Sequence, residues 1–472
     1  MRRYLLAGGP IVQALALTAC TPDVRPIPPS AAITAPLAWR DAAPGPTVGV
    51  EADWWRRLND PFLPDLIARA LANNSDVLGA VARVEEAEAV VRQTAAERMP
   101  TVDAGGSLGG QQGLGQAGTG PLSLSAQPQM SAAWTLDLFN RVRALEGAAR
   151  AHYVASQADR DAARLAVISA TVRGYVSLLS LAAQLHVSRE TLTSRQEALR
   201  IAKDRAILGY SSQFELTQAQ SEYEAVAQTI PDLEQAYRVQ ENALRRLTGD
   251  LPGDIARGEL RSIMLPAVPA ALPSTILRRR PDLASAEYAL VAADLKLASR
   301  RAEFLPSVHL TGSVGALFAN GLDWNPATLW NAGASVLAPI FAGGRLTANL
   351  NTASAQRDQA AFAYRGAVLT AFGEVENALS SERLLRQKAD NVMQRQTILQ
   401  RSLTLARDRY RGGYAAYIEE LDAQRNLLQV DLDAIRVREQ QLNNLVQLWA
   451  SLGGGWEARD ALTLPSDTSG PH

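Results

Sequence analysis

The sequence predicts a mainly α-helical fold with a β-barrel part, built from two tandem structural repeats in one chain. Three observations support this prediction. Hydrophobic residues make up 47% of the 472 residues but aromatic residues only 6%, a composition that favours long helices over an aromatic core. Blocks of residues recur about 205 positions apart, and four short segments alternate between apolar and polar residues.

The internal repeat is visible in glycine, proline and aspartate residues that recur in register. Residues 71–109 match residues 277–315 at a constant shift of 206, with eleven identities. A second block matches at a shift of 204, which places Gly209-Tyr210 on Gly413-Tyr414 and Glu215 on Glu419. Composition bias would repeat alanines but not these residue types. We therefore expect repeat 1 over 61–260, repeat 2 over 261–456 and a C-terminal tail over 457–472.

Each repeat is expected to contain a helix, a β-hairpin, a long helix and a further helix. In repeat 1 these segments are 62–97, about 101–139, 141–208 and 213–248, with a kink at Pro231. In repeat 2 they are 275–304, about 307–339, 345–408 and 417–450, and Gly412-Gly413 separates the last two helices. A helix of about 66 residues is about 100 Å long, so the shorter helices of each repeat can pack antiparallel along it.

The last helix has the seven-residue periodicity of a coiled coil. Apolar residues recur at every seventh position, and charged residues interrupt the pattern at Arg425 and Glu439. The recurring residues are Leu421, Leu428, Ile435, Leu442 and Trp449. This pattern predicts side-by-side helix packing but no particular function.

The segments between the helices have the alternation of half-buried strands. Strands are expected over 101–109, 130–138, 307–318 and 328–338, each with one apolar face. A soluble sheet packed on helices would explain any single hairpin. Four strands, each close to the nine to eleven residues that a tilted membrane-spanning strand needs, favour a membrane location.

The glycine-rich segment 105–120 contains the pattern Gly113-x-Gly115-x-x-Gly118, which resembles a dinucleotide-binding loop. That loop must open a helix, whereas this one continues into Thr119-Gly120-Pro121. We therefore expect a hairpin loop on the outer surface and no nucleotide site.

Four strands cannot close a barrel by themselves. An open sheet edge in lipid leaves backbone groups unpaired, at a cost of several kcal/mol each. Three copies would supply twelve strands, an even number within the range of known barrels and wide enough for an open lumen. The strand count therefore predicts a trimeric 12-stranded transmembrane β-barrel.

The N-terminus has the features of a targeting sequence. Arg2 and Arg3 precede a short apolar run, so residues 1–19 are expected to be a signal peptide. The run ends in Leu17-Thr18-Ala19-Cys20, which resembles a bacterial lipobox and implies a covalent lipid on Cys20. Residues 20–60 are then a lipidated, extended tether. Thr21 stands where an aspartate would retain a lipoprotein at the inner membrane, and this implies outer-membrane sorting.

Composition argues against several classes of function. The 47 basic and 48 acidic residues give a net charge of -1, which disfavours a nucleic-acid partner. The four histidines are scattered, so no metal site is expected, and the single cysteine cannot form an internal disulfide. The sequence contains no run of eighteen apolar residues, so we expect no membrane-spanning helix. No catalytic dyad or phosphate loop is found, and we expect neither an enzyme nor a bound cofactor other than the lipid.

Motifs across almost the whole mature chain resemble the outer membrane factor, or TolC-like, family in its lipoprotein branch, the OprM/NodT-type subunit of tripartite efflux systems. The segments that carry this resemblance are Trp54-Trp55, Asn59-Asp60-Pro61, residues 70–74 (ALANN), 134–139 (WTLDLF), 279–282 (RRPD), 304–306 (FLP), 339–345 (PIFAGGR), 421–425 (LDAQR) and 452–456 (LGGGW). Asn140 stands where the family more often has glycine.

The resemblance implies a homotrimer whose 12-stranded outer-membrane barrel continues into a 12-helix periplasmic α-helical barrel. Such a duct passes small molecules, including drugs and toxic compounds, from an inner-membrane pump and a periplasmic adaptor to the exterior. Two alternatives remain open at this point. The chain could be the outer-membrane component of a type I protein secretion system, or a periplasmic coiled-coil lipoprotein without a pore.

The resemblance also places a periplasmic gate at the turn around Gly412-Gly413 and an aspartate at the position of Asp422. We expect Asp422 and Glu419 to form an acidic constriction, since a three-fold axis would turn each carboxylate into a ring of three. Mutual repulsion between the carboxylates of such a ring opposes closure unless nearby cations offset it. The candidate cations are Arg409 and Arg411, with Tyr410 packed beside them. The alternative is that both carboxylates only stabilise the first turns of their helix, by about 0.3–1 kcal/mol each.

Overall fold

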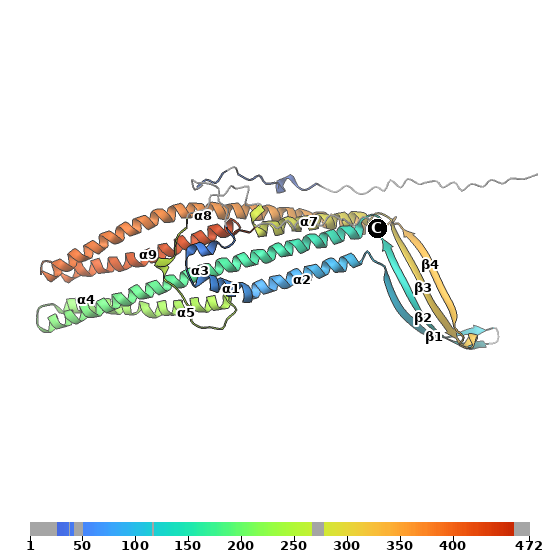
Figure 1. Ribbon diagram of the computed structural model, residues 1–472, viewed down its shortest axis with the longest axis horizontal. Helices are drawn as coiled ribbons and strands as arrows, with labels where there is room; N and C mark the ends of the chain where they lie inside the picture. The colour runs from blue at the N-terminus through green and yellow to red at the C-terminus, as the bar shows by residue number, and fades with distance from the viewer. Residues whose placement is uncertain (1–25, 37, 42–50, 116–117, 267–277, 457–472) are drawn as a thin grey trace, which may run out of the picture. The chain divides into compact units, whose positions relative to one another are not determined.

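The computed structural model describes residues 26–36, 38–41, 51–115, 118–266 and 278–456 (Figure 1). The predicted signal peptide, Cys20 and the predicted tail 457–472 lie outside the described residues. The chain divides into two compact units. Of the described residues, those within 26–28, 89–150 and 291–360 form the strand unit, and those within 29–88, 151–290 and 361–456 form the helix unit.

The strand unit holds one four-stranded antiparallel sheet, drawn as the adjacent arrows β1 to β4 in Figure 1. Its strands are β1 (Thr101–Gly115), β2 (Gly118–Leu136), β3 (Ser307–Ala319) and β4 (Ala327–Leu337), paired in the order β1-β2-β3-β4. The central pairing of β2 with β3 joins the two repeats. Strands β1 and β4 each have a free edge within the described part of the chain.

The strands of the first hairpin are longer than the segments 101–109 and 130–138 that the apolar–polar alternation predicted. The segment 105–120, expected as a loop, lies mostly within paired strands, with Gly105 opposite Gln129 and Gly110 opposite Leu124. A ladder needs only backbone N–H and C=O groups, which glycine also supplies. Pairing with β2 therefore overrides the low strand propensity of glycine. The second hairpin matches its predicted range.

Four helix segments adjoin the sheet in the strand unit. They belong to α2 (Ser75–Ala96), α3 (Arg141–Ile207), α7 (Pro281–Ala302) and α8 (Arg345–Arg411). Leu297 of α7 packs with Leu350 and Ala353 of α8. The carboxylate of Glu146 accepts hydrogen bonds from Arg98 and Arg150 at 2.7–3.1 Å. Burial acts to raise the pKa of Glu146, but these two hydrogen-bonded arginines lower it.

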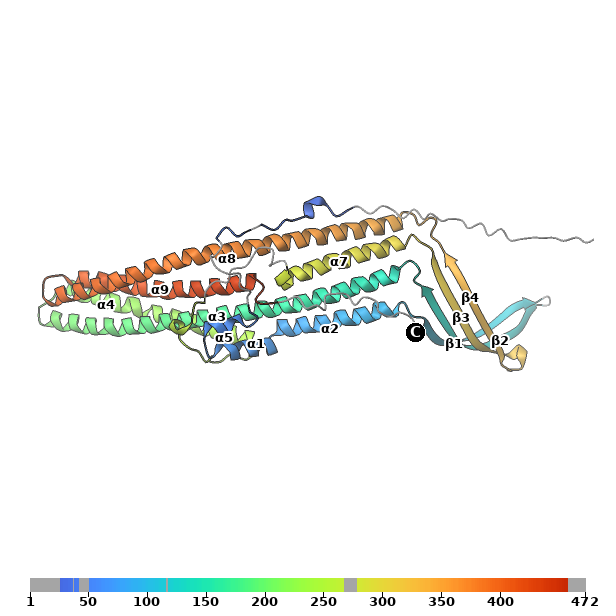
Figure 2. The same cartoon turned by 45° about the horizontal axis from the view of Figure 1, so that its top comes forward.

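The helix unit contains most of two helical hairpins, the short helix α1 (Leu63–Asn73) and the first parts of α2 and α7. In the first hairpin α3 turns back into α4 (Gln213–Ala227) and α5 (Thr229–Leu247), and in the second α8 turns back into α9 (Tyr417–Ser451). Side-chain contacts show that the partners are antiparallel. Arg189 meets Glu234 while Gln240 meets Gly174, farther back along α3. Figure 2 shows both hairpins ending side by side.

The main core of the helix unit is formed by α1, α3, α5 and α9. Trp54 and Trp449 pack with ring centroids 4.8 Å apart, and the buried Tyr175 hydroxyl donates to the Asp60 carboxylate at 3.0 Å. The predicted seam of α9 is confirmed at Leu421, Ile435, Leu442 and Trp449, which are all buried. One window of α3 is long and apolar enough to cross a membrane, but 61% of it is buried in the fold.

Two predicted helices are each divided. The segment 62–97 forms α1 and α2, because Asn74 leaves the helical conformation and caps the next helix. Its side-chain oxygen accepts from the backbone N–H groups of Asp76 and Val77. The segment 213–248 forms α4 and α5, which meet at Gln228, close to the predicted kink at Pro231. Proline lacks the N–H that would bond four residues back.

Part of the predicted tether packs against the helix unit. Trp39 is buried beside Phe372 of α8, with ring centroids 5.8 Å apart. The backbone N–H of Arg40 donates to Glu376 at 3.0 Å, and Asp41 pairs with Arg383 at 3.2 Å. Residues 29–31 and 54–58 form short 3-10 helices. The segment that follows the predicted lipid site is therefore attached to α8 at Trp39.

Candidate functional site at the helical turns

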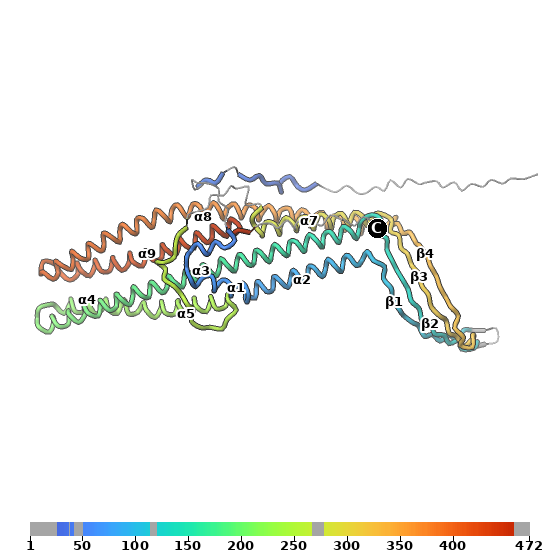
Figure 3. The backbone as a smooth tube through the Cα atoms, viewed as in Figure 1, coloured from blue at the N-terminus to red at the C-terminus, as the bar shows by residue number. Residues whose placement is uncertain are grey.

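The two helical hairpins end in turns of the same construction, which lie next to each other in Figure 3. Gly209 and Gly413 have φ angles of +75° and +77°, a conformation that favours glycine. The N–H of Tyr210 donates to the carbonyl of Arg205 at 2.8 Å, and the N–H of Tyr414 donates to that of Arg409 at 2.9 Å. The repeat predicted this equivalence. Both turns present exposed tyrosine side chains.

Tyr410 of α8 links the second hairpin to the first. Its hydroxyl donates to Glu215 of α4 at 2.5 Å, and the guanidinium of Arg205 lies 5.1 Å from its ring centre. Its ring also packs on Tyr417, at 5.5 Å. Burial and the hydrogen bond to Glu215 raise the pKa of Tyr410 above its ordinary value. The hydroxyl therefore keeps its proton and remains a donor.

A buried ionic cluster lies farther from the turns. Glu222 of α4 accepts a hydrogen bond from Nε of Arg425 in α9 at 2.9 Å, and its other oxygen lies 3.7 Å from Arg195 of α3. Arg195 is 2% exposed and also donates to Gln424. Burial lowers the pKa of Arg195, and Glu222 acts against this shift. Three helices from both hairpins thus meet in one polar contact.

The predicted gate residues occupy the second turn and its flanks. Arg409 pairs with Glu419 at 3.4 Å, across the turn. Asp422 is exposed and pairs with Arg425 of its own helix at 3.4 Å. Arg411 is exposed and forms no ion pair within the described part of the chain. Of the two predicted cations, the structure therefore brings only Arg409 to a predicted carboxylate.

Sequence reasoning missed Arg195, Glu222 and Arg425 as a cluster. A signal was present, because Arg425 interrupts the apolar seam of α9, and a charge at a seam position needs a polar partner. The other interruption has the same explanation, since Glu439 accepts a hydrogen bond from Ser177 of α3 at 2.6 Å. The partner itself could not be predicted, because it lies about 200 positions away in the chain.

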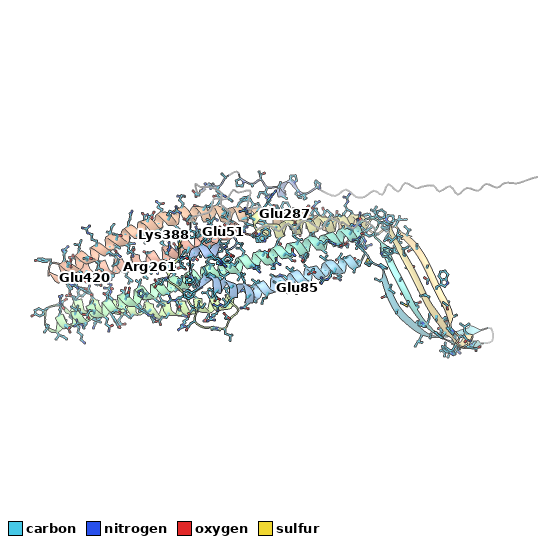
Figure 4. The ribbon with its side chains drawn as sticks, in the orientation of Figure 1. Glu51, Glu85, Arg261, Glu287, Lys388 and Glu420 are labelled. Carbon is cyan, nitrogen blue, oxygen red and sulfur yellow. The ribbon has the colours of Figure 1, made fainter. Side chains whose placement is uncertain are left out.

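The side chains at the turns pack on one another and form hydrogen bonds and ion pairs. Within the described residues, no group of three or more histidine, cysteine, aspartate or glutamate side chains is placed to hold a metal ion. Glu420, labelled near the second turn in Figure 4, accepts hydrogen bonds from Arg407 and Gln424 at 3.3 and 2.9 Å. These contacts of Glu420 lie within the second hairpin, whereas Tyr410 with Glu215 and Arg425 with Glu222 join the two hairpins.

The family model described as outer membrane efflux protein matches residues 66–250 and 272–454, one segment for each repeat. The chain belongs to the outer membrane efflux protein family. The predicted resemblance is therefore confirmed. The family consists of transport channels and not of enzymes.

Individual relatives of this outer membrane efflux protein match it over nearly its full length. The pyoverdine export outer membrane protein OpmQ of Pseudomonas putida is 31% identical over 463 residues, covering 94% of this chain and 96% of OpmQ. The toluene efflux pump outer membrane protein TtgI of Pseudomonas putida is 33% identical over 406 residues, covering 84% of this chain and 86% of TtgI.

The outer membrane channel CmeC of Campylobacter jejuni has a similar structure. Its TM-score is 0.85 at 25% sequence identity, covering 90% of this chain and 93% of CmeC. The efflux protein thus has the predicted fold class, mainly helical with a four-stranded β part in two repeats. It is an outer membrane channel for efflux.

Proposed function

We propose that this efflux protein forms, as a homotrimer, the gated exit duct of a tripartite pump that expels small molecules. The observation that carries the proposal is the four-stranded sheet with free edges on β1 and β4. In a bilayer those edges need partners, because lipid offers no hydrogen bonds. Pairing of β4 with β1 of the next copy would satisfy both edges at once.

Three copies support a closed structure of useful width. Twelve strands give a barrel between the small eight-stranded barrels, which side chains fill, and the large porins. Each chain contributes two long helices, and the shorter helices extend alongside them, so three chains supply the twelve columns of the predicted helical barrel. The lack of charged residues on β2 and β4 suits a membrane location.

The proposed partners are a periplasmic adaptor and an inner-membrane pump. The exposed apolar side chains at the two turns, Ile207, Tyr210, Phe214 and Tyr414, offer a docking surface for the adaptor. The names of OpmQ and TtgI refer to two different small compounds. This supports small-molecule cargo over protein secretion, without selecting one compound.

The gate is proposed to lie where the two hairpins contact each other. Tyr410 with Glu215, and Arg425 with Glu222, would hold the turns together in the closed state, and the acidic residues Asp422 and Glu419 would line the constriction. Separation of the hairpins would break these contacts and widen the opening. Both contacts are hydrogen bonds to a carboxylate, each worth about 1.5–3 kcal/mol. Arg425 is exposed although Glu222 is buried, and the Tyr410 contact is partly buried.

The test is the mass and the conductance of the purified full-length protein. In detergent we expect a single species of about three times the mass of the mature chain. The same preparation should form ion-conducting pores in a planar bilayer. A monodisperse monomer that retains its strands would contradict the closure argument, and a trimer without conductance would contradict the duct.

A further inference from the structure

Basic residues are concentrated at one end of the sheet. The pairings Thr101 with Ala133, Leu136 with Val308 and Ser307 with Leu337 place all four strand–helix junctions in one row. The junction segments are 97–101, 136–143, 300–307 and 337–345. Together they contain six arginines and three carboxylates, a net charge of +3 in a chain whose total is -1.

The other end of the sheet has the opposite character. Its connecting segments, 111–123 and 319–327, contain no basic residue and one acidic residue, Asp323. On the strands themselves the only Asp, Glu, Lys or Arg is Asp103. The arginines therefore mark one boundary of the proposed membrane-spanning part rather than both.

Four of these six arginines have no carboxylate partner among the described residues. Arg98 and Arg300 pair with Glu146 and Glu303. Arg141, Arg143, Arg301 and Arg345 form no ion pair within the residues that the structure describes. A guanidinium without a partner is suited to a phosphate, which it binds through two parallel hydrogen bonds.

The placement of Arg141 and Arg345 is unfavourable for the helices. They are the first residues of α3 and α8, and neither helix has an acidic residue in its first turn. A cation near a helix N-terminus opposes the helix dipole. For α3 the carboxylate of Asp137 compensates by accepting from the N–H groups of Val142 and Arg143. Residues that break a local rule in this way often serve a function.

Exposed apolar side chains precede both arginines. Ile340 and Phe341 are 98% and 90% exposed, and Leu138 and Phe139 are also exposed. Both strand-to-helix junctions thus have the same order of an apolar residue, a phenylalanine, a backbone with positive φ and an arginine. Apolar and aromatic groups beside arginines are typical of the boundary between hydrocarbon and headgroups.

We propose that these arginines, which we call the arginine belt (Arg141, Arg143, Arg301 and Arg345), bind the phosphate headgroups of anionic phospholipids in the periplasm-facing leaflet of the outer membrane. The inference rests on the outer-membrane location and on the sheet as the membrane-spanning part. Arginine near an anionic surface contributes attraction that falls off with ionic strength. The belt sets the depth of the sheet in the membrane.

The test uses the full-length protein in a neutral detergent, titrated with short-chain phosphatidylglycerol. In the variant Arg141→Gln/Arg345→Gln we expect binding at least about fivefold weaker, the effect of a single arginine at such a surface. The matched control is Arg261→Gln/Arg401→Gln, which removes two exposed arginines of the helix unit; Arg261 is labelled in Figure 4. The control should bind like the wild type.

Two further ligands identify the source of the phosphate. Short-chain phosphatidylcholine and inorganic phosphate should both bind more weakly than phosphatidylglycerol. Equal affinity of the belt variant and the wild type, or phosphate binding as tight as lipid binding, would overturn the proposal. Unchanged lipid binding with altered anion selectivity of the pore would overturn it too, since the arginines would then face the lumen. Trimer mass, measured on the same samples, reports separately on the proposed duct.

Discussion

In the proposed gate, the hydrogen bond between Tyr410 and Glu215 would have to break before the two hairpins could separate. The bond joins two hairpins whose turns are 204 positions apart in register, and its acceptor is a carboxylate. A hydrogen bond to a charged group contributes about 1.5–3 kcal/mol. That energy is enough to hold a contact closed most of the time and small enough for a partner protein to overcome.

Replacing Tyr410 by phenylalanine should favour the open state of the proposed gate. Tyr410→Phe removes the donor to Glu215 but keeps the ring that packs on Tyr417. We expect higher conductance or more frequent opening in single-channel recordings from a planar bilayer. Tyr414→Phe is the matched control, because that exposed side chain lies on the same turn. Identical recordings for Tyr410→Phe and the wild type would exclude this bond from the gate.

The bounds of helices and strands could be predicted where the local sequence determines them, but not where contacts with distant residues determine them. The α3 and α8 helices match their predicted ranges because no proline or paired glycine interrupts either segment. The extent of β1 could not be predicted, because pairing with β2 decides the conformation of its glycines. At the turns, Arg409 and Glu419 are close in sequence and do pair. Arg195 of α3 instead has one partner in its own hairpin, Glu222 of α4, and one in the other hairpin, Gln424 of α9.

The break between α1 and α2 offers a test at this scale. Asn74→Ala removes the cap on Asp76 and Val77 and the bond that its side-chain amide donates to the carbonyl of Leu247 at 3.1 Å. We expect a loss of stability of about 1 kcal/mol or more, seen as a lower midpoint of thermal unfolding in detergent. Asn73→Ala, at an exposed neighbouring position, should change the midpoint little. A wild-type midpoint for Asn74→Ala would show that the break does not depend on this cap.

At the scale of the whole molecule we expect two means of attachment to the outer membrane. The sheet is the part that spans it, and Cys20 is expected to carry a lipid. A diacylglyceryl group and one acyl chain together anchor a protein stably, since each buried CH₂ contributes about 0.8 kcal/mol. Trp39, in the segment that follows Cys20, packs against α8. The strands pair with one another without the lipid, so we expect the two attachments to act independently.

We predict that removing the lipid attachment site leaves the protein in the membrane. Labelled palmitate should enter the wild type and not Cys20→Ser, while both proteins should fractionate with the outer membrane. Equal labelling would assign the lipid to another residue or to none. Loss of Cys20→Ser from the membrane fraction would mean that the strands alone do not hold the chain there.

The pairing of β2 with β3 has a consequence for the order in which the chain folds. Each hairpin joins strands that are close in sequence and can form within microseconds, whereas Leu136 and Val308 are 172 positions apart. Bringing them together requires closure of a long loop, and distant pairings of this kind slow folding. The helices of repeat 1 shorten that search when they form first, because their antiparallel packing returns the chain towards its starting point. We therefore expect the sheet to be completed late, after synthesis of the helices that connect its two halves.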